Sequence, residues 1–155
     1  MHLENGRKWL VEHLANTSVE IEIEGIHQTV FMSDCKRTKI RIRNKCNHII
    51  IDQCEAIEFH FDAVITTLEV MHSHDIHIAC LTHVPTITID SVDKIMIQLP
   101  SSSLDTQILS CKSTEMNVRW PDASSPDGFL ERYLPQQLTH KIDGGGIIST
   151  PAVLY

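Results

Sequence analysis

The chain has 155 residues, a formal net charge of −7 at pH 7, 42% hydrophobic residues and only 5% aromatic residues. This length suits one domain with its own core, and the acidic balance argues against nucleic acid as the main partner, because phosphate binding requires a basic surface. No run of about 18 apolar residues is present, so we expect no membrane insertion and a cytoplasmic location. Five cysteines without a C-x-x-C motif favour a reducing compartment.

The first predicted element is an N-terminal cap over residues 1–18. It contains the apolar residues Trp9, Leu10, Val11 and Leu14. An open β-structure has to cover its ends, and this segment precedes the first strand-like run. We therefore expect it to cover the start of the following repeat.

Residues 19–118 consist of short, β-branched, alternating runs that predict half-buried strands. Apolar residues recur in these runs with a period of 19. The pattern holds in five sets of positions: Val19, Thr38, Ile57, Ile76, Ile95 and Thr114; Ile21, Ile40, Phe59, Ile78, Ile97 and Met116; Ile23, Ile42, Phe61, Cys80, Leu99 and Val118; Val30, Ile49, Leu68, Ile87 and Thr106; Met32, Ile51, Val70, Ile89 and Ile108.

A fixed period of two strands and their corners predicts a parallel β-helix with coils of about 19 residues, in which residues 19 apart stack on one another. Crossovers between parallel strands are almost always right-handed, so we expect a right-handed coil in an all-β single domain. An antiparallel sandwich is the alternative, and it predicts no such register. The outward positions alternate in charge between coils, so the basic stretch 36–45 is expected to be partly neutralised rather than to bind nucleic acid.

The histidine-rich stretch HSHDIHIACLTH (72–83) resembles a metal site at first sight. The repeat, however, directs Cys80 into the core and His77 outward, so the two cannot meet at one ion. We therefore predict no metal site. Instead, His74 should stack between Glu55 and Asp93, which favours protonated imidazole and predicts a pH-sensitive surface.

After Val118 the repeat ends, and residues 119–134 read as a linker. Asp143-Gly144 lies between two strand-like runs and predicts a β-hairpin within residues 135–155. From the residues alone, this hairpin could fold back on its own coil or add to the sheet of another chain.

Several of these segments resemble the C-terminal domain of cyclase-associated proteins. The resemblance is carried by VPTITID (84–90), by SSSLDTQILSCKSTEMNV (101–118) and by K-W-x-V at residues 8–11, and it extends from about Lys8 to the end. It implies a right-handed parallel β-helix without enzymatic activity or cofactor, as a short form consisting of this domain alone or as an excised domain. It also implies binding to monomeric actin, with a preference for the ADP form, promotion of nucleotide exchange, an association with the cytoskeleton, and cofilin-bound actin as a further partner.

The resemblance further implies a homodimer that exchanges C-terminal hairpins, and it suggests candidate residues for both interactions. The candidate actin-binding residues are Thr86, Thr88, Asp105, Lys112, Ser113, Glu115, Asn117, Leu154 and Tyr155. The candidate dimerisation residues are Leu138, His140, Ile142, Ile147, Ile148 and Thr150.

Two classes of enzyme compete with this interpretation. A tubulin-cofactor-C-like GTPase-activating domain requires an arginine that projects from its catalytic face. The arginines here are at positions 7, 37, 41, 43, 119 and 132, outside the middle coils. Polysaccharide-cleaving β-helices require clustered carboxylates in an aromatic-lined groove, which the tight period and the low aromatic content do not favour.

Overall fold

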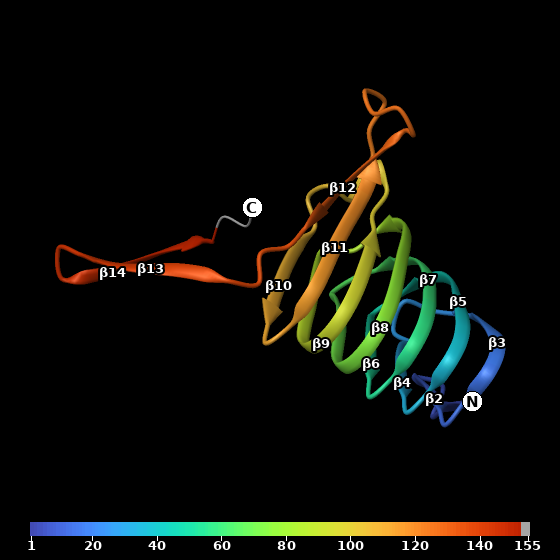
Figure 1. Cartoon of the computed structure of the whole chain (residues 1–155). Coiled ribbons are helices and arrows are strands. Elements are labelled where there is room, and N and C mark those ends of the chain that lie inside the picture. The colour runs from blue at the N-terminus through green and yellow to red at the C-terminus, as the bar shows by residue number, and fades with distance from the viewer. Residues whose placement is uncertain (153–155) are drawn as a thin grey trace.

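The computed structural model describes residues 1–152, which form β-strands and one short 3-10 turn (Figure 1). Within these residues no helix is long and apolar enough to cross a membrane. The strands and the turn are β1 (His2–Glu4), β2 (Lys8–Glu12), β3 (Ala15–Glu22), β4 (Thr29–Ser33), β5 (Lys36–Cys46), β6 (His48–Asp52), β7 (Glu55–Val64), β8 (Thr67–His83), β9 (Thr86–Gln98), η1 (Ser101–Ser103), β10 (Gln107–Cys111), β11 (Thr114–Pro121), β12 (Phe129–Tyr133), β13 (Leu138–Asp143) and β14 (Gly146–Pro151).

The strands wind into a parallel β-helix with two long faces (Figure 1). Face 1 contains β2, β4, β6, the first half of β8, the first half of β9, and β10, all paired in parallel. Face 2 contains β3, β5, β7, the second halves of β8 and β9, and β11, again in parallel. The predicted fold class, an all-β parallel β-helix, is confirmed.

The uniform period of 19 is correct for the middle coils and wrong for the first and last steps. Ile40 pairs with Phe59, 19 residues later, but Ile21 pairs with Ile42 and Ile95 with Met116, each 21 residues later. The two additional residues lie in longer corner loops, at 24–28 and 99–106. Because side chains alternate with a period of two, a shift of two residues keeps apolar residues inside.

The core therefore matches the prediction closely. The positions predicted to point inward are buried except for four in the first and last coils: Val19, Thr106, Ile108 and Thr114. Phe59 and Phe61 are fully buried, with ring centroids 6.3 Å apart. The cysteines at 35, 46, 54 and 80 are buried and free, and burial raises the pKa of the Cys46 and Cys80 thiols to about 12.

The corner between face 1 and face 2 has an unusual backbone. Two columns of residues other than glycine adopt left-handed conformations, which L-residues normally avoid. Both columns follow the steps of 21, 19, 19, 19 and 21 residues. The first column is His13, Asp34, Gln53, His72, Ser91 and Lys112, and the second is Asn16, Arg37, Ala56, Asp75, Lys94 and Glu115.

The side chain just after the first column points into the core. Cys35, Cys54, Ser73 and Val92 occupy these positions, as predicted. Cys111, which the 19-residue period placed next, is exposed, and Ser113 takes the position because the last step has 21 residues. The Ser113 hydroxyl accepts a hydrogen bond from the Val92 amide at 3.0 Å.

Both ends of the coil differ from the predicted boundaries. Lys8–Glu12, assigned to the cap, is a strand of the first coil, because its apolar residues stack on β4; only β1 covers it. The buried Gln28 side chain fixes this end by accepting a hydrogen bond from the Trp9 indole at 3.2 Å. At the other end, the predicted linker 119–134 contains the end of β11 and all of β12, which pair in antiparallel register.

The predicted C-terminal hairpin is present as β13 and β14, which pair only with each other among the described residues. Its two-residue turn is Gly144-Gly145, both with positive φ, whereas Asp143 ends the strand. Glycine suits this turn because both central residues of a tight hairpin require positive φ. Figure 1 shows the hairpin extending away from the coil.

Candidate binding surfaces

The candidate actin-binding residues lie in separate places on the molecule. Thr86 and Thr88 are half-buried on the outer side of face 1, beside Gln107 and Leu109 of β10. Asp105, which the 19-residue period placed in the same column as Thr86, lies in the preceding loop because the last step has 21 residues. There its carboxylate is 2.9 Å from Nε2 of His83.

A second group lies at the last corner of the coil. Lys112 and Glu115 are exposed and close the two left-handed columns, while Asn117 is half-buried on face 2 beside Met96. Ser113 is buried, with only 8% of its surface exposed, so it supports the corner and does not present a contact. Leu154 and Tyr155 lie outside the described residues.

A groove of about 500 Å³ joins this corner to the base of the hairpin. The Glu115 amide donates a hydrogen bond to Oε1 of Gln136 at 3.0 Å, and the Thr114 hydroxyl bonds to Asp93. The sequence gave no sign of Gln136, because its role depends on the path of the chain after β12. The groove is lined by Ser110, Cys111, Lys112, Ser113, Thr114, Met116, Pro135, Gln136, Gln137 and Leu138.

The histidine-rich strip has the predicted geometry. His74 pairs in register with Glu55 and Asp93, and its Nδ1 is 3.2 Å from an Asp93 oxygen. His77 is exposed beside Glu58, whereas Cys80 is buried on the inner side of the same strand. Among residues 1–152, no three His, Cys, Asp or Glu side chains converge in a way that could hold a metal ion.

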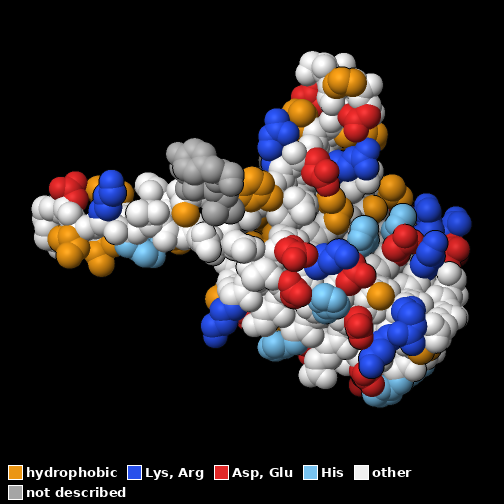
Figure 2. All heavy atoms as spheres, viewed as in Figure 1, with side chains coloured by type: hydrophobic (Ala, Val, Ile, Leu, Met, Phe, Trp, Pro, Cys, Tyr) orange, Lys and Arg blue, Asp and Glu red, His pale blue; other side chains and the backbone are white. Residues whose placement is uncertain are grey.

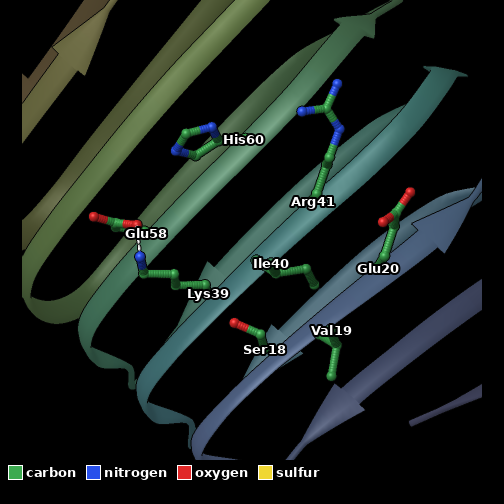
Figure 3. Close-up of a pocket in the computed structure, with 8 residues that line it drawn as sticks. All are labelled: Ser18, Val19, Glu20, Lys39, Ile40, Arg41, Glu58 and His60. Carbon is green, nitrogen blue, oxygen red and sulfur yellow. Dashed lines mark ion pairs between the residues drawn. The ribbon is translucent and has the colours of Figure 1, made fainter.

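The basic stretch on β5 is partly paired, as predicted. Figure 3 shows Lys39 directed toward Glu58 of β7, with Nζ 3.2 Å from the carboxylate. Arg43 pairs with Glu20 of β3 on the other side. Charges of both signs surround a shallow hollow of about 410 Å³, which suits a salt-bridged wall rather than a phosphate-binding surface.

The hairpin exposes its apolar side chains. Leu138, Ile142 and Ile147 share one face and are 54%, 88% and 71% exposed. Ile148 and Thr150 lie on the opposite face, so the six candidate dimerisation residues do not form a single surface. Figure 2 shows hydrophobic side chains grouped at the free end of this projection.

The coil also ends in an uncovered apolar hollow of about 420 Å³. Leu104 is 55% exposed there, and nearby Leu109 is 59% exposed. The hollow is lined by Leu99, Leu104, Thr106, Ile108, Val118, Trp120, Arg132 and Leu134. The same chain thus carries an apolar hairpin without cover and an apolar coil end without cover.

These features define a class: a parallel β-helix domain with exposed corner ridges and a projecting hairpin. Residues 1–154 match the family described as "Adenylate cyclase associated (CAP) C terminal". The chain is 37% identical to adenylyl cyclase-associated protein 2 of Homo sapiens over 150 residues and 32% identical to cyclase-associated protein 1 of Arabidopsis thaliana over 152 residues. These matches cover 95% and 97% of the chain, but only 30% and 32% of the relatives.

The crystal structure of cyclase-associated protein from Cryptosporidium parvum superposes with a TM-score of 0.91 and 26% identity, covering 97% of this chain and 93% of that one. The chain belongs to the C-terminal domain family of the cyclase-associated proteins, and the resemblance noted in the sequence is confirmed. The tubulin-cofactor-C-like alternative finds no support in these matches.

Proposed function

We propose that this chain binds monomeric actin, prefers its ADP form and promotes nucleotide exchange, as a non-enzymatic regulator of filament turnover in the cytoplasm. The observation that carries the proposal is membership of the cyclase-associated C-terminal family over residues 1–154. The fold is compatible with a binding role, because a rigid coil loses little conformational entropy when it docks.

The last corner is the surface that we assign to actin. Lys112 and Glu115 project there from a ridge that the hydrogen-bonded corners hold in place, and Asn117 lies beside them on face 2. Exchange without chemistry requires tighter binding to the open form of actin than to the closed form. A surface fixed before docking can supply this difference because it does not adapt equally to both forms.

The test is a titration of labelled ADP-actin and ATP-actin monomers, together with the release rate of a fluorescent nucleotide. Replacing Lys112, Glu115 and Asn117 by alanine should weaken ADP-actin binding by roughly tenfold or more, as expected for a cluster of contact residues. The matched control replaces Lys39 and Glu58, an exposed pair on face 2 away from this corner. Equal affinity of the triple variant and the control would refute the assignment, and adding cofilin would test cofilin-bound actin as the partner.

We also propose that two copies exchange their C-terminal hairpins. An isolated two-stranded hairpin is at best marginally stable in water, and no described residue of β13 or β14 is buried. The apolar hollow at the coil end offers complementary cover. Insertion of each hairpin at the partner's coil end would cover both surfaces at once and form a closed twofold dimer.

A further inference from the structure

The first coil leaves one strand edge without a neighbour. Within residues 1–152, β3 pairs with β5 only, whereas β2 at the same end is covered by β1. At the opposite end, β12 covers β11. Figure 1 shows β3 as the outermost strand of face 2. This edge is therefore a place where another strand can add.

The backbone of β3 presents free hydrogen-bonding groups along this edge. Ile23 donates its amide to the Arg43 carbonyl at 2.9 Å, so its peptide groups face β5. Peptide groups alternate in direction along an extended strand, and those of Ser18, Glu20 and Glu22 are therefore directed to the open side. Such groups form a regular ladder with an incoming strand.

The inner side of β3 also lacks the cover that the next coil has. Thr38 and Ile40 are only 1% and 2% exposed, because strands lie on both sides of them. Thr17 and Val19, their register partners on β3, are exposed and half-buried respectively. An added strand would complete the layer over these two inward positions.

The charge on this edge restricts which strand can add. Glu20 and Glu22 point outward, and within the chain they lie opposite Arg41 and Arg43 of β5. Opposite charges across a strand pair stabilise it, and like charges destabilise it. A second copy would bring its own Glu20 and Glu22 against the same residues, which argues against pairing of two β3 edges.

We propose that the β3 edge binds an extended segment of a partner protein in which lysine or arginine alternates with apolar residues. The segment adds as a strand, its peptide groups bond to β3, its basic side chains face Glu20 and Glu22, and its apolar side chains cover Val19. The chain's own β5, with the sequence KIRIR at 39–43, shows the pattern that this edge accepts. This interaction is independent of the proposed binding of actin.

The test uses two fluorescent peptides and the complete chain. The first copies residues 37–45, RTKIRIRNK, and the second, RTEIEIENE, replaces its lysines and central arginines by glutamate. In anisotropy titrations the basic peptide should bind and the acidic peptide should not. Glu20→Lys with Glu22→Lys should weaken the basic peptide by roughly 2- to 30-fold, from two cross-strand charge pairs. The matched control is Glu58→Lys, which breaks an exposed pair away from the edge.

A second readout does not depend on the variants folding. In hydrogen exchange on the unmodified chain, the basic peptide should slow exchange at the Glu20 and Glu22 amides and leave the Ile21 amide unchanged. Equal binding of the two peptides, or unchanged exchange at Glu20 and Glu22 under saturating peptide, would overturn the proposal. The glutamates would then act only to keep other strands away from this edge.

Discussion

The apolar face of the C-terminal hairpin gives the sharpest test of the proposed dimer. Ile142 and Ile147 lie opposite each other on β13 and β14 and are 88% and 71% exposed. Full burial of an isoleucine side chain is worth roughly 1.5–3 kcal/mol, so covering both residues in both chains would contribute about 5–10 kcal/mol. Threonine keeps the strand propensity and one methyl group, so Ile142→Thr with Ile147→Thr should remove about half of this.

The dimer dissociation constant should therefore rise by roughly 10²- to 10³-fold. Sedimentation equilibrium over a dilution series measures this change directly, as a shift from twice the 17.6 kDa chain mass toward the mass of the single chain. The matched control is Ile148→Thr on the opposite face of the hairpin, which should have a smaller effect. An unchanged dimer in the double variant, or an unmodified chain that is monomeric at every concentration, would contradict hairpin exchange.

Three further predictions concern stability. Between pH 9 and 12 the unfolded chain loses the Cys46 proton that the folded chain keeps, so the free energy of unfolding should fall by about 1.4 kcal/mol per pH unit for this thiol; Cys46→Val should flatten this part of the pH profile. Ala56→Gly should stabilise by about 0.5–1 kcal/mol, since it relieves a left-handed residue, whereas Ala63→Gly in a strand should destabilise. Phe59→Ala should cost about 3–5 kcal/mol in urea unfolding, and the half-buried Phe31→Ala clearly less.

Alternation and period together allowed the fold to be predicted from the sequence. Ile40, Phe59 and Ile78 are stacked and buried as expected, because inward columns must be apolar in every coil. The departures arise in loops. Neither Gly25–Gln28 nor Ser101–Ser103 has an apolar pattern, so the additional residues in the first and last steps leave no trace in a search for a fixed period.

The binding surfaces were harder to predict for the same reason. Ser113 matches a family motif, yet the 21-residue step turns it into the core. The open edge of β3 and the exposed face of the hairpin depend on which strands lack neighbours. That property belongs to the assembled coil, and no local run of residues expresses it.

The two kinds of coil step have a consequence for changes in the length of the domain. The three middle steps share one geometry, so a segment of 19 residues such as 55–73 is an interchangeable module: its removal or duplication would keep the strand register and the left-handed corners of its neighbours. The 21-residue steps are end-pieces fitted to β1 at one end and to η1 and β12 at the other. Insertions and deletions of whole modules should therefore be tolerated in the middle of the coil, while the terminal coils accept neither.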